Sequence, residues 1–181
     1  MSECVGEKEL LFKVADLLTG KVELDLLLCR TLFDVAETGI SLRGDVRLTA
    51  ELKPRREDII LTGSMTVPFE MVCSRCLKSY KVDSLIELDG TFRAKVEGEG
   101  VEEMLDESGP DISFYESGKV DILPIIRDNI YLSIPMKPLC SEDCQGVCPR
   151  CGADRNGMGC SCVSEDIDPR LEVLKSLRGN S

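Results

Sequence analysis

The chain has 181 residues, of which 43% are hydrophobic and 30% are charged, and its formal net charge is -11. This composition is that of an ordinary globular protein. The aromatic content is only 4%, there is no Trp, and the negative charge repels a phosphate backbone. These features argue against a protein that binds nucleic acid through stacked bases and a basic surface.

The N-terminus lacks the charged and apolar regions of a signal peptide, and no apolar run approaches the roughly 20 residues that cross a bilayer. We therefore expect a cytoplasmic protein without membrane contact. The chain also contains no His, the commonest general base, and shows no Gly-rich phosphate loop or nucleophile motif. We expect it not to be an enzyme.

Four segments alternate hydrophobic and polar residues with the period of a half-buried strand. They cover residues 22–28, 42–53, 59–71 and 80–96. The polar turn KPRRED joins the second and third segments, so these two are expected to form a long hairpin. In the last segment the alternation stays in phase across Gly90, which favours a continuous strand with a bulge or a close approach at this glycine.

Residues 97–116 contain eight acidic residues, several glycines and no Lys or Arg. This composition predicts a solvated linker or long loop. The simpler interpretation is that it serves solubility. The alternative is an acidic strip that mimics nucleic-acid phosphate toward a basic partner.

Two helices are predicted after this loop. In VDILPIIRDNIYLSIP, Asp121 can cap a helix near residues 121–133, and Pro124 is tolerated in its first turn. Its isoleucines form one stripe, which is expected to cover the sheet. The second helix, DPRLEVLKSLR at residues 168–178, is too short to be stable alone in water and must dock on this protein or on a partner.

These elements predict an α+β fold. An antiparallel β-sheet, with closure into a barrel left open, is covered by a helix and followed by a C-terminal Cys-rich zinc-binding module and a short terminal helix. The expected division is a sheet domain at residues 1–138 and a Cys-rich module with the terminal helix at residues 139–181. The sheet domain includes the acidic loop 97–116.

Eight of the ten cysteines form two candidate sets of metal ligands. Cys4 in the N-terminal segment is set aside, as is Cys29, which is expected to be a small core residue. The safer set is Cys148, Cys151, Cys160 and Cys162. The second set is Cys73, Cys76, Cys140 and Cys144, which would pin the segment after the helix to the hairpin tip. All-thiolate sites suit zinc, so one or two zinc ions are expected, and a closed four-coordinate shell makes their role structural.

Other interpretations of the cysteines remain open. Cys140 or Cys144 could replace either member of the Cys160-Ser-Cys162 pair. The spacing from Cys144 to Cys151 also matches the iron-sulfur motif of radical enzymes, although only 30 residues follow it. Clustered thiolates could alternatively form a redox switch that releases zinc on oxidation.

The ordered series VCSRCLKSY, VDILPIIRDNIYLSIPMKPLC, CSEDCQGVCPRCG and IDPRLEVLKSL resembles the bacterial YceD family over roughly residues 42–177. The positions that match are Cys73 and Cys76, the helix from Asp121, and the segment 168–171. The resemblance implies a cytosolic factor for normal levels of large-subunit (23S) ribosomal RNA, and therefore a role in ribosome assembly without catalysis.

The acidity of the chain favours a protein partner, either a ribosomal protein or a large-subunit precursor. The competing hypothesis is direct RNA contact through basic residues near the cysteines, namely Arg75, Lys78, Lys81, Arg150 and Arg155. The alternative function is a zinc-thiolate redox-sensitive regulator or chaperone. The sequence does not predict an oligomeric state.

Overall fold

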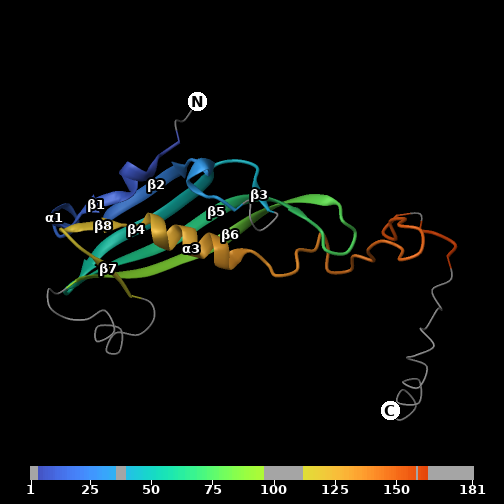
Figure 1. The fold of residues 1–181 in the computed structure, drawn as a ribbon. Helices are drawn as coiled ribbons and strands as arrows, with labels where there is room; N and C mark the ends of the chain where they lie inside the picture. Colours follow the sequence, from blue (N-terminus) through green and yellow to red (C-terminus); the bar gives the residue numbers. More distant parts are fainter. Residues whose placement is uncertain (1–3, 36–39, 96–111, 158, 163–181) are drawn as a thin grey trace, which may run out of the picture.

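The computed structural model describes residues 4–35, 40–95, 112–157 and 159–162 (Figure 1). The fold of this part is mixed α+β, with one dominant sheet and few helices. The strands of that sheet are β2 (Val22–Leu28), β3 (Ser41–Leu42), β4 (Val46–Arg55), β5 (Asp58–Val72), β6 (Ser79–Ala94) and β7 (Ile112–Tyr115).

The main sheet has the order β2-β4-β5-β6-β7, with the short β3 pairing with β5 outside this path. The described strands do not close, because β2 and β7 stand at opposite ends of the order. The α+β class is therefore confirmed, whereas the barrel-like alternative is not seen in the described part of the chain.

Smaller elements complete the described fold. They are η1 (Glu7–Leu10), β1 (Leu11–Lys13), α1 (Val14–Leu17), η2 (Arg30–Leu32), β8 (Lys119–Asp121) and α3 (Leu123–Ser133). Strands β1 and β8 form a separate antiparallel pair. Among the described helices, none has the length and hydrophobicity of a membrane span.

The predicted hairpin is confirmed, and its turn is tighter than expected. The β4–β5 ladder continues as far as the pair Arg55 and Asp58, so only Arg56 and Glu57 form the turn. Arg56 adopts a left-handed φ of 60°. The additional strand pairs were not predicted, because KPRRED is polar and was interpreted as a turn. Polar side chains are equally compatible with an exposed strand end.

Strand β6 is continuous across Gly90, as the unbroken alternation predicted. Gly90 pairs with Leu61 in the β5–β6 ladder. A Cβ atom at Gly90 would lie 2.2 Å from Cδ1 of Ile125 in α3. The glycine therefore marks the expected close approach, which lets the helix lie directly on the sheet.

The helix covers one face of the sheet, as predicted (Figure 1). Ile126 and Ile130 of α3 are buried in the same core as the inward side chains of the strands. The helix begins at Leu123, whose backbone N–H donates to the Asp121 carboxylate at 3.0 Å. Pro124 lies in the first turn, where its missing N–H costs nothing.

The prediction of a loop through residue 116 is wrong at its C-terminal end. Residues 112–115 form β7, which pairs in parallel with β6 from Thr91 to Ala94. This ISFY segment is only four residues long, and the acidic residues before it dominated the composition of the window. Residues 96–111 of the predicted loop and the predicted helix 168–178 lie outside the described residues.

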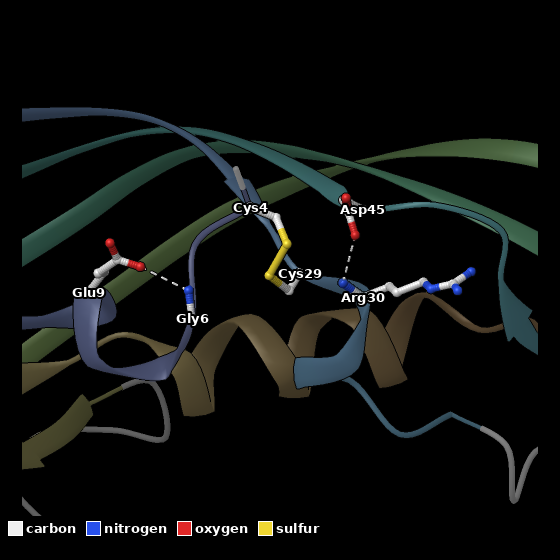
Figure 2. The surroundings of a disulfide bond; sticks show 6 residues. All are labelled: Cys4, Gly6, Glu9, Cys29, Arg30 and Asp45. Carbon is white, nitrogen blue, oxygen red and sulfur yellow. Dashed lines mark hydrogen bonds between the residues drawn. A yellow bond between two sulfur atoms is a disulfide. The ribbon is translucent and has the colours of Figure 1, made fainter. Parts of the chain in front are cut away.

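The expectation for Cys29 is also wrong. Cys29 forms a disulfide with Cys4 (Figure 2). Two backbone hydrogen bonds hold the N-terminal segment beside the end of β2, from Val5 N to Leu27 O at 2.7 Å and from Cys29 N to Val5 O at 3.2 Å. This contact between distant segments brings the two thiols together, and neither local sequence indicates it.

Candidate metal centres

The first cysteine pair lies in the connection between β5 and β6. The backbone N–H of Leu77 donates to the carbonyl of Cys73 at 2.9 Å, and the N–H of Cys73 donates to the carbonyl of Lys78 at 2.9 Å. These bonds curl Cys73-Ser-Arg-Cys76 into a knuckle that directs both thiols to the same side. Leu77 has a φ of 60°, a left-handed conformation that side chains rarely adopt.

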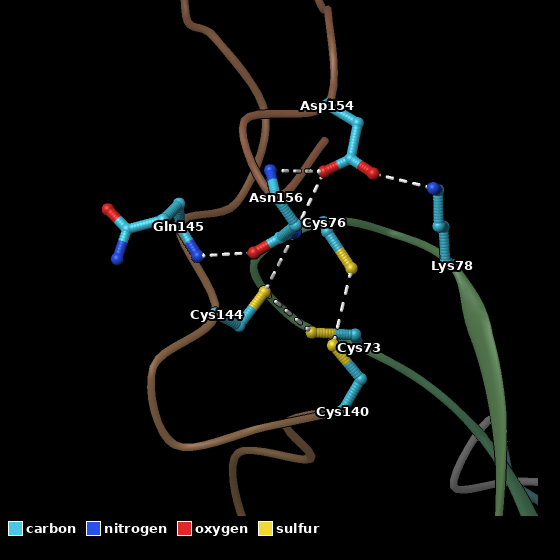
Figure 3. Close-up of polar contacts among 8 residues, drawn as sticks. All are labelled: Cys73, Cys76, Lys78, Cys140, Cys144, Gln145, Asp154 and Asn156. Carbon is cyan, nitrogen blue, oxygen red and sulfur yellow. Dashed lines mark hydrogen bonds and ion pairs between the residues drawn. The ribbon is translucent and has the colours of Figure 1, made fainter. Parts of the chain in front are cut away.

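The segment after α3 brings the other two thiols to this knuckle. The sulfur atoms of Cys73 and Cys144 are 3.7 Å apart, as are those of Cys76 and Cys140 (Figure 3). Three of the four side chains are buried and Cys140 is exposed. We call this set the hairpin cluster.

Arg75 connects the two halves of the hairpin cluster. Its guanidinium donates to the carbonyl oxygens of Glu142 and Cys144 at 2.9 and 3.0 Å. Its own carbonyl accepts from the N–H of Val147 at 3.1 Å. The side chain therefore fixes the path of the incoming loop around the thiols.

The remaining four cysteines form a second group, which we call the tail cluster. Cys148-Pro-Arg-Cys151 repeats the knuckle: the N–H of Gly152 donates to the carbonyl of Cys148 at 2.8 Å, and the N–H of Cys148 donates to the carbonyl of Ala153 at 2.8 Å. Here the left-handed position is a glycine, with a φ of 72°. Cys160 and Cys162 complete the group.

The structure brings the eight cysteines together in the two sets preferred from the sequence. In each set all four sulfur atoms lie within 4.8 Å of one another, so each set is geometrically able to hold a metal ion. Neither Cys140 nor Cys144 joins the tail cluster, which was the alternative that the sequence left open.

Local hydrogen bonds divide the thiols into two kinds. The pKa of Cys73 is lowered to about 6, mainly by the backbone N–H of Cys76, and that of Cys148 is lowered to about 6, mainly by the backbone N–H of Cys151. The pKa of Cys140 is raised to about 12, mainly by its contact with the Cys144 thiol. The first cysteine of each knuckle is thus prepared as a thiolate, and a cation is needed before all four sulfurs can ionise together.

Polar contacts join the two clusters. Asp154 accepts from Lys78 at 2.5 Å and from the backbone N–H of Asn156 at 2.9 Å, and these contacts lower its pKa to about 2. The Asn156 amide in turn donates to the sulfur of Cys144 at 3.4 Å (Figure 3). Asp154 and Asn156 were not among the site residues predicted from the sequence. The available signal was Asp-Arg-Asn directly after a knuckle, because such residues favour turns that bond to their own backbone.

A family model described as "Large ribosomal RNA subunit accumulation protein YceD" matches residues 61–178. The chain belongs to the YceD family. The match includes all eight clustered cysteines, and the family membership confirms the resemblance drawn from the sequence motifs.

Individual relatives are distant. An uncharacterized protein of Mycobacterium leprae is 27% identical over 118 residues, which are 65% of this chain and 51% of the relative. The Large ribosomal RNA subunit accumulation protein YceD of Haemophilus influenzae is 23% identical and covers 61% of this chain and 63% of its own length.

The "Large ribosomal RNA subunit accumulation protein YCED homolog 1, chloroplastic" of Arabidopsis thaliana is 36% identical over 63 residues, or 35% of this chain and 20% of its own. The chain spans about half the length of the mycobacterial relatives that it matches. No solved structure matches it.

Proposed function

We propose that this protein is a non-catalytic ribosome-biogenesis factor that supports the accumulation of large-subunit ribosomal RNA. The observation that carries the proposal is the YceD family match over residues 61–178, together with the names of the relatives from Haemophilus influenzae and Arabidopsis thaliana. In this proposal the protein acts in the cytoplasm by binding a ribosomal protein or an assembly intermediate.

Zinc is the metal that the donor sets suit best. Tetrahedral zinc with Zn–S bonds of about 2.3 Å separates its sulfur ligands by about 3.8 Å. The pairs Cys73–Cys144 and Cys76–Cys140 stand at 3.7 Å. Thiolate-only donors also exclude the harder cations, which prefer oxygen ligands.

Both sites would be structural. Four protein thiolates fill the tetrahedral shell of zinc and leave no position for water or substrate. In the hairpin cluster the ion would join Cys73 and Cys76 of the sheet domain, residues 1–138, to Cys140 and Cys144 of the Cys-rich module, residues 139–181. Zinc would thereby hold the module as a rigid extension of the β5–β6 hairpin.

A protein partner is favoured over direct RNA contact. Two of the basic residues considered for RNA are engaged within the protein, Arg75 with two backbone carbonyls and Lys78 with Asp154. Two filled Cys4 sites would also make the net charge of -11 more negative, because each carries four thiolates and one divalent cation. Such a surface attracts a basic protein and repels RNA.

The test is sedimentation of the native protein in a fresh lysate on a sucrose gradient, at low and at high salt. At low salt we expect the protein to sediment together with large-subunit precursors. At high salt this association should be lost, because exposed charge pairs are screened. A protein that stays at the top of the gradient at both salt concentrations would contradict the proposal.

The second candidate function is a redox-sensitive zinc-thiolate regulator or chaperone. It is favoured by the exposure of Cys151 and Cys160 in the tail cluster, because accessible thiolates oxidise first. The measurement is zinc release under mild peroxide, followed with a colorimetric chelator. Release of one zinc per chain, coupled to a change in partner binding, would support this function. Zinc retained at peroxide levels that oxidise free thiols would exclude it.

A further inference from the structure

Most of one long edge of β6 carries no neighbour within the described residues. β5 pairs with the other edge along the length of β6, whereas β7 reaches only Thr91 to Ala94. From residue 79 to residue 90, the described chain makes no backbone pairing to the outer edge of the strand. A strand edge of this kind presents N–H and C=O groups that can pair with an added strand.

A groove of about 800 Å³ lies along this part of β6. It is lined by Thr62 and Ser64 of β5, by Leu85, Glu87 and Asp89 of β6, and by Asn129 of α3. The contribution from α3 is informative, because this helix lies on the opposite, covered face of the sheet (Figure 1). Because the groove is lined both by a residue of α3 and by residues on the uncovered face of β6, it lies at the edge of the strand, where the two faces meet.

The charge of the groove differs from that of several other acidic positions on the uncovered face, which are paired. Glu51 pairs with Lys21, Asp25 with Arg47, Asp58 with Arg93, and Asp83 with Arg43. Glu87 and Asp89 make no ion pair with any described residue. Within the described part of the chain their two carboxylates are therefore not neutralised, and a cationic ligand would complement them.

The same face of β6 also offers an apolar contact. Leu85 precedes Glu87 and Asp89 at alternate positions, and this residue is 72% exposed. Residues i, i+2 and i+4 share one side of a strand. An extended segment lying beside β6 would meet Leu85, Glu87 and Asp89 in succession, so an alternating basic segment with an apolar residue at one end fits this row.

Charge disfavours this chain's own remaining segments as the occupant. Residues 96–111 carry seven acidic residues and no Lys or Arg, and residues 163–181 carry four acidic and three basic residues. Each of these segments carries a net negative charge as a whole, so each is a poorer complement to Glu87 and Asp89 than a basic segment would be. A basic segment of another protein is therefore the better match.

We propose that the free edge of β6 binds a basic, extended segment of a partner protein by strand addition. The backbone of the segment pairs with residues 79–90, and its Lys or Arg side chains face Glu87 and Asp89. This inference rests on the proposed function, because a ribosomal protein supplies a basic partner, and it assigns the surface where that partner binds.

The test uses the full chain and two labelled nonapeptides. One peptide alternates Lys and Val, and the other has Pro in place of each Val, so that its charge is kept while strand pairing is prevented. We expect the Lys–Val peptide to bind at low salt and the Lys–Pro peptide to bind at least ~10-fold more weakly. Equal affinities, measured by fluorescence anisotropy, would overturn strand addition.

A matched pair of variants locates the site. E87K/D89K reverses the two carboxylates of the groove, and E23K/D25K reverses two carboxylates with the same spacing on the same face of β2. Both variants change the net charge equally. We expect E87K/D89K to weaken binding of the Lys–Val peptide by ~10-fold or more, and E23K/D25K by less than ~3-fold. Equal losses would reduce the effect to general electrostatics and overturn the site.

Amide hydrogen exchange maps the contact directly. Adding the Lys–Val peptide should slow exchange within residues 79–90, and protection confined to other residues would refute the edge as the site.

Gradient sedimentation separates the two proposals. If wild-type protein travels with large-subunit precursors while the peptide tests fail, the edge inference is wrong and the proposed function stands. If wild-type protein does not travel with them, the proposed function itself fails.

Discussion

The hairpin cluster and the tail cluster use the same knuckle in different surroundings. Both knuckles place Arg third, and both place a left-handed residue after the second cysteine, Leu77 in one and Gly152 in the other. The hairpin cluster is mostly buried and joins cysteines that are 64 and 71 positions apart. The tail cluster takes all four cysteines from residues 148–162, and its members Cys151 and Cys160 are exposed.

Because of this difference, the two clusters are expected to contribute differently to the stability of the protein. A crosslink between distant residues removes more conformational entropy from the unfolded chain than a crosslink within a short loop. The hairpin cluster also depends on the sheet, because β5 and β6 position its knuckle. We therefore expect metal in the hairpin cluster to stabilise the whole fold, and metal in the tail cluster to stabilise mainly its own segment.

The largest effect is expected from Cys73→Ser. This change removes a fully buried ligand and leaves three thiols without their ion, so the metal content should fall by one per chain. The thermal midpoint of the sheet should fall by about 10 °C or more, since structural zinc contributes folding free energy directly. Circular dichroism and elemental analysis measure both quantities, and an unchanged midpoint would contradict the role assigned to the hairpin cluster.

Cys160→Ser is the matched change in the tail cluster. It should also remove one metal ion per chain, but the midpoint of the sheet should fall by less than about 3 °C, because the crosslinked loop is short. The same two measurements apply. If this variant lowers the midpoint as much as Cys73→Ser does, the proposed contrast between the clusters is wrong.

A smaller effect is expected from Asp154→Ala, which removes the contacts of this carboxylate with Lys78 and Asn156. Amide exchange at Val147 and Arg155 should become several-fold faster, while exchange in β5 stays unchanged. Asp143→Ala, which removes an exposed acid of the same Cys-rich module, serves as the control. Equal exchange in both variants would mean that Asp154 does not couple the clusters.

The smallest effects concern the left-handed residues. Gly152→Ala should weaken metal binding by the tail cluster by roughly fivefold, because a Cβ at positive φ costs about 1 kcal/mol. Chelator competition measures this change in affinity.

Leu77→Gly should raise the thermal midpoint by about 2 °C by relieving the same strain. Thermal unfolding measures this change. A lower midpoint for Leu77→Gly would show that contacts of the leucine outweigh its backbone strain.

The main sheet and its helix followed from local patterns. Alternation predicted β2, β4, β5 and β6, and the phase across Gly90 correctly indicated a continuous strand. The short β7 was missed because four residues carry little periodic signal, and its parallel pairing with β6 depends on distant chain. The Cys4–Cys29 disulfide was missed for a similar reason, since the contact arises from packing of the N-terminal segment against β2.

The sequence by itself determined the local parts of this protein: the strand faces, the helix and both knuckles. Each depends on residues only a few positions apart, so short-range sterics and hydrophobic periodicity are sufficient to specify it. The tertiary structure decided between the cysteine partitions that the sequence left open, with Cys140 and Cys144 at the hairpin knuckle. It alone decided that Asp154 and Asn156 join the two clusters, and that residues 79–90 of β6 have no described neighbour on their outer edge. These features are contacts between segments distant in the chain, and their geometry exists only after the sheet has folded.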